Sequence, residues 1–171
     1  MHKPERLACA CGFLVLVTSS IAQAGTLAPA DKRFLDEAAR MEMTTAHEAE
    51  MAQKQASRAE VKDFAQMLAK DNSDGYNKLF TVAGKTGSEI PKGINSGTIP
   101  AIRRLSALNG SHFDHEFAAD EIAAERRAIA LFKQEATHGR DADLKAYANE
   151  MLPVLNNDLK RAEECAKSKA K

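Results

Sequence analysis

The fold class is set by residues 61–82, which read VKDFAQMLAKDNSDGYNKLFTV. Residues on one face of this segment, here called its seam, follow one another in steps of four and three. They are Val61, Ala65, Leu68, Asn72, Gly75, Leu79 and Val82. A mean spacing of 3.5 residues is typical of a helix that packs at a shallow angle in a left-handed bundle. The stretch therefore predicts one long helix with a single inward-facing seam.

Three other segments carry the same spacing, so the chain should contain four long helices. Their seams are Phe34, Ala38, Met41, Thr45, Glu48 and Ala52; Ala118, Ile122, Glu125, Ile129, Phe132 and Ala136; and Leu144, Ala148, Met151, Leu155, Asp158, Ala162 and Cys165. Recurrent alanine lets the helices approach closely, and the composition, without tryptophan, favours helix. We therefore predict an all-α, ferritin-like four-helix bundle.

Local signals place the ends of these helices. Ser57–Glu60 matches a capping box before the second helix, and residues 86–98 read as a loop that leads into a short helix over 99–108. Gly139 stands where a glycine usually ends a helix, and Asp141 or Asp143 caps the last helix. Beyond the helix pairs we detect no repeat of fixed period.

Proline interrupts the pattern of the last helix. Pro153 lies inside it, where the missing N–H donor predicts a kink near Asn149.

The first 24 residues have the three parts of a secretory signal. Lys3 and Arg6 precede an apolar run over 11–22, and Ala22-Gln23-Ala24 forms an A-x-A cleavage site. A helix of that length is too short to span a bilayer. We therefore expect residues 1–24 to be cleaved, leaving one domain over 25–171 in the periplasm or secreted, without a membrane anchor.

The mature chain has a nearly balanced charge. Removing Lys3, Arg6 and Glu5 from 24 basic and 24 acidic residues leaves 22 and 23. This balance gives no reason to expect nucleic acid as a partner, and the oligomeric state stays open. Cys165 is the one cysteine beyond the signal, so it is either an inert thiol or part of an intermolecular disulfide.

Polar residues interrupt each seam near the middle of its helix. They are Thr45, Glu48, Asn72, Glu125 and Asp158. Near mid-helix, such residues lie at similar heights whichever way the helices alternate. We interpret them as a hydrated polar layer that fixes helix register. The alternative is a metal site formed by Glu48, Asn72, Glu125 and Asp158, with iron, manganese or zinc as the ion.

The histidines and nucleophiles give weaker signals. His112 and His115 are three residues apart, a spacing that can hold a metal, but no third ligand accompanies them. His47 reads as a packed flank residue, and His138 as a helix-end residue. No motif for a catalytic nucleophile or a phosphate-binding loop is present in the sequence, so we do not predict an enzyme.

Several motifs resemble an exported bacterial domain of unknown function, labelled an outer membrane protein and grouped with ferritin-like bundles. They are DKRFLDEAA (31–39), AQKQAS (52–57), VKDFAQMLAKD (61–71), Phe113-Asp114 and LPVL (152–155). The resemblance extends from about residue 31 to 164. It implies histidines at the positions of Asn72, Glu125 and Asp158, so a metal site built on them would be lost or altered here. It implies a fold and a compartment but no reaction.

Three functions are compatible with these observations. The first is a non-catalytic periplasmic bundle that acts as a binding or stress-related module. The second is a ferritin-like metal-binding protein in which the di-metal site is altered or lost. Such a protein could have redox activity if it still binds a metal. The third is a groove that binds peptides or lipids, suggested by Met41, Met43 and Met51. A pocket between helices wide enough for a ligand would favour the third.

Overall fold

The computed structural model describes residues 26–168, and every secondary-structure element in that range is a helix. The elements are α1 (Pro29–Gln55), α2 (Ala59–Thr86), η1 (Ser96–Thr98), α3 (Ile99–Ser106), α4 (Gly110–His138) and α5 (Ala142–Lys167). Four long helices with a short helix between the second and third confirm the predicted all-α four-helix bundle. The predicted signal, residues 1–24, lies outside the described residues.

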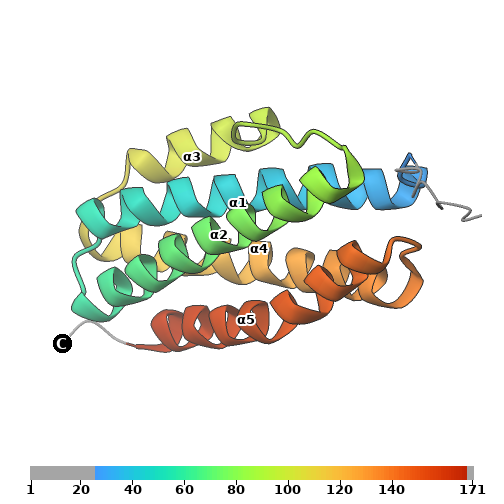
Figure 1. The fold of residues 1–171 in the computed structure, drawn as a ribbon. Coiled ribbons are helices and arrows are strands. Elements are labelled where there is room, and N and C mark those ends of the chain that lie inside the picture. The colour runs from blue at the N-terminus through green and yellow to red at the C-terminus, as the bar shows by residue number, and fades with distance from the viewer. Residues whose placement is uncertain (1–25, 169–171) are drawn as a thin grey trace, which may run out of the picture.

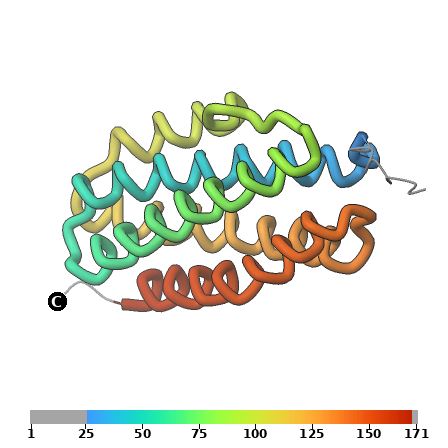
Figure 2. Tube along the Cα trace, viewed as in Figure 1, coloured from blue at the N-terminus to red at the C-terminus, as the bar shows by residue number. Residues whose placement is uncertain are grey.

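The long helices run antiparallel to their neighbours around the bundle (Figure 1, Figure 2). α2 ends at the opposite end of the bundle from the start of α4 (Figure 1). Residues 87–109 therefore have to return along the bundle, and α3 forms within that return, in contact with α4. The connection is long because of this topology.

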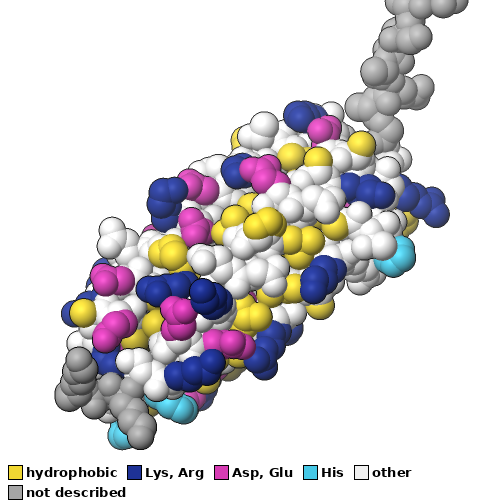
Figure 3. All heavy atoms as spheres, turned by 90° about the horizontal axis from the view of Figure 1, so that it is seen from below, with side chains coloured by type: hydrophobic (Ala, Val, Ile, Leu, Met, Phe, Trp, Pro, Cys, Tyr) yellow, Lys and Arg dark blue, Asp and Glu magenta, His cyan; other side chains and the backbone are white. Residues whose placement is uncertain are grey.

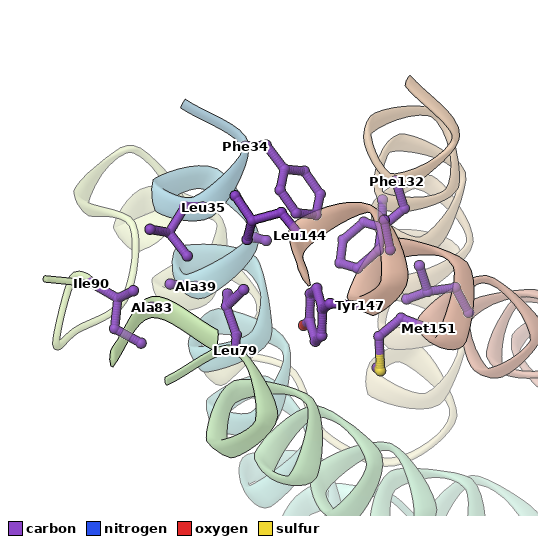
Figure 4. Packing of buried hydrophobic residues seen from close by; sticks show 14 of the residues in the cluster. Phe34, Leu35, Ala39, Leu79, Ala83, Ile90, Phe132, Leu144, Tyr147 and Met151 are labelled. Carbon is purple, nitrogen blue, oxygen red and sulfur yellow. The ribbon is translucent and has the colours of Figure 1, made fainter. Parts of the chain in front are cut away.

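Two apolar clusters, one in each half of the bundle, form the core. In one, the rings of Phe34, Phe132 and Tyr147 meet at centroid distances between 5.1 and 6.3 Å (Figure 4). In the other, the rings of Phe64 and Phe117 lie 5.9 Å apart. Aromatic pairs at these separations add to the stability gained from burial. Every residue of the four predicted seams is buried or half-buried, so the seams are confirmed.

The start of α2 is capped by another helix, so the predicted capping box is wrong. Ser57 and Arg58 donate their backbone N–H groups to the Asp114 carboxylate of α4, at 2.9 and 3.0 Å, and the Ser57 hydroxyl donates to it at 2.6 Å. Burial opposes the ionisation of Asp114, but these bonds together lower its pKa. A buried carboxylate therefore does what Ser57 and Glu60 were expected to do locally.

The start of α5 is held in the same way. Asp31, in the first turn of α1, accepts from the backbone N–H groups of Arg140 and Asp141 at 3.1 and 2.9 Å. The Asp141 side chain in turn accepts from the N–H of Leu144 at 2.9 Å, which confirms one of the two predicted caps. Asp31 in the first turn of α1 and Asp114 near the start of α4 thus tie the two helical hairpins together.

These reciprocal caps reveal an internal repeat that the sequence analysis missed. Asp31 and Asp114 are 83 positions apart (114 − 31 = 83), and the same offset relates the N–H donors of residues 57–58 and 140–141. It also relates Phe34 to Phe117, Glu42 to Glu125, Val61 to Leu144, Phe64 to Tyr147, Ala65 to Ala148 and Leu68 to Met151. Hairpin α1–α2 and hairpin α4–α5 therefore follow one pattern.

Two other local expectations need correction or refinement. Gly139 follows α4 but has a φ of −56°, so it does not end the helix by a left-handed turn; Gly87, with a φ of 66°, does this after α2. Pro153 lies inside α5 without ending it, and Figure 2 shows α5 changing direction along its length.

The surface mixes charges of both signs. On the face drawn in Figure 3, basic and acidic side chains alternate around apolar atoms. None of the helices within residues 26–168 has the length and apolarity needed to cross a membrane.

Candidate functional site: a buried acidic layer beneath a groove

A layer of buried polar side chains separates the two apolar clusters. Glu42 of α1, Glu125 of α4 and Asp158 of α5 are 3%, 2% and 0% exposed, and Asn72 of α2 and Thr45 of α1 are buried with them. Glu121 of α4, also fully buried, lies one turn from Glu125. Each long helix therefore contributes at least one polar side chain to this acidic layer.

Glu42 sits in a space prepared for its carboxyl group. The Tyr147 hydroxyl donates to Glu42 Oε1 at 2.8 Å. A Cβ on Gly75 would lie 2.5 Å from Glu42 Oε2, so a larger residue at position 75 would have to displace this carboxyl group. Burial raises the pKa of Glu42 to about 8; the bond from Tyr147 opposes the shift and the charge of Asp158 adds to it.

The other carboxyl groups of the layer are also easier to protonate than in water. Burial raises the pKa of Glu125 to about 9, and Asp158 and Glu42 add to the shift. Burial, with a contribution from Asp71, raises the pKa of Asp158 to about 7, and burial holds the pKa of Glu121 well above its usual range. Near neutral pH the layer is thus largely composed of neutral carboxylic acids.

Several oxygen atoms of the layer have no hydrogen-bond partner among the described residues. They are both carboxyl oxygens of Glu121 and of Asp158, and one each of Glu42 and Glu125. A cavity of about 10 Å³ lies beside Glu42, Thr45, Asn72 and Glu125. That volume holds about one water molecule, which would satisfy part of this unmet hydrogen bonding.

The residues of the layer do not fit a di-metal centre. Within residues 26–168, no group of three or more His, Cys, Asp or Glu side chains is arranged to hold a metal ion. The buried acids offer oxygen atoms alone, whereas ferritin-like centres combine carboxylates with imidazoles. The layer therefore lacks the ligand set of a ferritin-like di-metal centre.

A large groove opens between α1 and α4, directly above the acidic layer. Its volume is about 580 Å³, within the range of sites for small molecules. The α1 wall carries Arg40, Met41, Thr45 and Glu48, and Arg127 lies on the α4 wall. Met41, Thr45 and Ala124 line both this groove and the small cavity below it, so one layer of side chains separates the two spaces.

The connection between α2 and α4 forms a roof over the groove. Asn95, Thr98 and Ala101 line the groove from above. The Asn95 backbone N–H donates to Thr44 Oγ1 of α1 at 3.1 Å. On the other side, Arg104 of α3 donates to both carboxylate oxygens of Asp120 on α4, at 3.0 and 2.7 Å. The roof is thus fastened to both walls.

A smaller hollow of about 180 Å³ continues the groove toward the end of α4. Glu37 and Leu131 line both spaces. Here Glu135 and His138 form a Glu-x-x-His sequence, which the sequence analysis overlooked. Burial raises the pKa of Glu135 to about 7, Asp31 and Asp141 add to the shift, and Lys145 opposes it. A Cβ on Gly139 would lie 2.6 Å from the backbone oxygen of Glu135, which explains the glycine at this helix end.

A family model described as "Domain of unknown function (DUF4142)" matches residues 16–165. The chain belongs to the DUF4142 family. A crystal structure of a DUF305 fragment from Deinococcus radiodurans is similar in fold, with a TM-score of 0.73 and 12% sequence identity. The match covers 83% of this chain and 98% of that one, and at this identity it concerns the fold alone. A search of curated proteins gave no match.

Three of the four predicted site residues of this DUF4142 protein meet in the acidic layer. Asn72, Glu125 and Asp158 are buried there, as their seam positions indicate. Glu48 is half-buried and lines the groove instead; burial raises its pKa to about 7, with Asp120 adding to the shift and Arg127 opposing it. Whether any of these four residues binds metal stays a prediction.

The histidines and Cys165 lie away from the layer. His47, His112 and His115 are exposed, so His47 is not the packed residue expected, while His138 lines the small hollow. Cys165 is 3% exposed within an apolar cluster, and burial raises the pKa of its thiol. A buried, protonated thiol fits the prediction of an inert cysteine better than a disulfide between chains.

Sequence reasoning missed Glu42 and Glu121 because each lies one position off the seam. Glu42 follows Met41, and Glu121 precedes Ile122, so both looked like surface positions. The internal repeat carries the signal that was needed: Glu42 aligns with Glu125, which lies on a seam.

Proposed function

We propose that this DUF4142 protein is an exported, non-catalytic binding module that takes a small amphipathic ligand in the groove between α1 and α4. The observation that carries the proposal is the roofed space of about 580 Å³, which has both apolar and charged walls. Export rests on the three-part segment over residues 1–24. The ferritin-like relationship and the periplasmic or secreted location belong to the same proposal.

Packing explains why the opening occurs at this seam. Phe132, Tyr147 and the alanines fill the space between helices in the apolar clusters. At the height of the groove, α1 and α4 instead face each other with Thr45, Ala123 and Ala124, and the roof lies above them. Small side chains on facing helices leave a gap that only the connecting segment covers, which suits reversible entry of a ligand.

The test uses a neutral apolar dye, 1-N-phenylnaphthylamine, and two matched variants of α4. Ala123 is exposed and lines the groove, whereas Ala130 is exposed and does not. Ala123→Phe should fill the groove, and Ala130→Phe adds the same ring to the outer surface. Saturable fluorescence enhancement should occur with the wild type and Ala130→Phe and be weakened at least about tenfold in Ala123→Phe.

Two outcomes would overturn the proposal. Equal dye binding by both phenylalanine variants would place the ligand elsewhere, provided that both variants melt like the wild type. Stoichiometric iron, manganese or zinc in protein purified without an affinity tag would instead favour the metal-binding alternative at the acidic layer.

A further inference from the structure

The groove holds two arginines whose side chains form no ion pair within residues 26–168. Arg40 lines it from α1 and Arg127 from α4. Neither is among the side chains that form ion pairs in the described part of the chain, whereas Arg58, Arg104 and Arg126 each bind a carboxylate there. Two guanidinium groups on opposite walls thus stay available to a ligand that enters between them.

The acidic residues of the groove compensate for this charge only in part. Asp120 accepts from Arg104 Nη2 through both of its carboxylate oxygens, on its own side of the roof. Glu48 holds its proton to higher pH than usual because burial raises its pKa to about 7. Glu37 is the remaining acid, and it stands at the end where the groove meets the smaller hollow. Near pH 6 the middle of the groove is therefore cationic.

Apolar side chains lie beside the two arginines. Met41 and Ala124 form the floor, Leu131 lies toward the smaller hollow, and Ala101 contributes to the roof. A ligand that matches these walls needs one anionic group and a short apolar body. Arginine binds carboxylates through two parallel N–H bonds, and methionine adapts to flexible apolar chains.

We infer that the groove binds a small carboxylate-bearing amphiphile, with the carboxylate between Arg40 and Arg127 and the apolar chain over Met41 toward Leu131. This rests on the proposed function and adds the chemical class of the ligand. The two arginines fix its orientation, so the sign of the ligand's charge determines affinity as much as its apolar surface does.

The test compares three ligands that share one chain length: decanoate, decanol and decyltrimethylammonium. Binding is measured at pH 6 by displacement of 1-N-phenylnaphthylamine, below the critical micelle concentration of each ligand. Decanoate should bind at least about tenfold more tightly than the other two. Arg40→Gln and Arg127→Gln should each weaken decanoate binding about tenfold and leave decanol binding unchanged.

Arg103→Gln is the matched control, because Arg103 is an exposed arginine of α3 that does not line the groove. It should bind decanoate like the wild type. Equal affinities for all three ligands, or arginine variants that bind decanoate normally, would overturn the inference. Blockage of dye binding by Ala123→Phe would still support the groove in that case. Failure of the dye itself would remove the proposed function and the inference together.

Discussion

At the scale of single residues, the unusual feature is that several glutamates are buried as neutral acids. Glu125 illustrates this: it is 2% exposed, one of its oxygens has no partner among the described residues, and burial raises its pKa to about 9. The folded state therefore keeps a proton that the unfolded chain releases above the usual glutamate pKa. Stability is fully present below that value and declines as the pH rises toward about 9.

We predict that Glu125→Gln removes part of this pH dependence. At about pH 3.5 the variant and the wild type should unfold at similar urea concentrations, because Glu125 is then mostly protonated in both the folded and the unfolded state. Between pH 5 and 8 the variant should gain up to about 1.4 kcal/mol per pH unit over the wild type. Exposed Glu50→Gln is the control and should show a difference that does not grow with pH. A constant difference for Glu125→Gln would contradict a neutral acidic layer.

Two glycines of α2 provide a second test at this scale. A Cβ on Gly75 would lie 2.5 Å from Glu42 Oε2, whereas a Cβ on Gly84 meets nothing within 4 Å. Gly84→Ala should stabilise the protein by about 0.5–1 kcal/mol through helix propensity. Gly75→Ala should destabilise it by about 1–2 kcal/mol, because the crowding costs more than the propensity gains.

The reason for that cost can be checked in a second background. In Glu42→Ala the obstructing carboxyl group is absent, so Gly75→Ala should become stabilising like Gly84→Ala. Chemical denaturation of the double variant measures this coupling directly. If Gly75→Ala costs the same with and without Glu42, then the glycine has another role.

At the scale of secondary-structure elements, the helix ends are fixed by tertiary contacts. Asp114 is almost fully buried and accepts hydrogen bonds from residues 57–58 at the start of α2. Asp114→Ala should lower the free energy of unfolding by about 2–4 kcal/mol, since it removes charged hydrogen bonds and leaves buried donors unpaired. Asp74→Ala, which breaks an exposed ion pair with Lys70, should cost less than about 1 kcal/mol. Thermal denaturation measures both, and equal losses would contradict the capping role.

Helix boundaries were therefore harder to predict than helix faces. The burial of seam residues such as Leu68 and Ile129 could be predicted, because the spacing of apolar residues in the sequence identifies the inward face of each helix. The start of α2 depends on Asp114, which is 57 positions away from Ser57, and no local pattern carries that information. The local sequence at Ser57–Glu60 fits a capping box, but in the structure the buried Asp114 carboxylate accepts the hydrogen bonds at the start of α2.

At the scale of the whole molecule, the two halves of the bundle depend on each other. Each hairpin supplies the aspartate that caps the other, and both contribute to each apolar cluster. We therefore expect Leu68→Asp in one cluster and Ile129→Asp in the other to unfold the entire domain, since an unpaired buried carboxylate costs several kcal/mol. Lys92→Ala, in the exposed connection, should melt like the wild type. Circular dichroism that shows half of the helix content retained in either core variant would contradict this.

For the candidate site, too, the seam spacing in the sequence predicts some of the residues and not others. The seam interruptions at Asn72, Glu125 and Asp158 indicated a polar layer, and burial places all three there. Glu42 and Glu121 lie off the seam, and their burial depends on local packing, including the space left by Gly75. The groove could not be predicted at all, because it requires the path of residues 87–109 over two helices that are distant in sequence.

The most direct test of ligand binding between α1 and α4 is a methyl NMR titration with decanoate, using protein labelled at the methionine methyl groups. Met41 lines the groove, whereas Met67 and Met151 do not, so one spectrum contains both the probe and its controls. The Met41 signal should shift and saturate with decanoate while the Met67 and Met151 signals stay in place. Saturable binding that moves Met67 or Met151 but leaves Met41 unchanged would contradict a binding site in this groove.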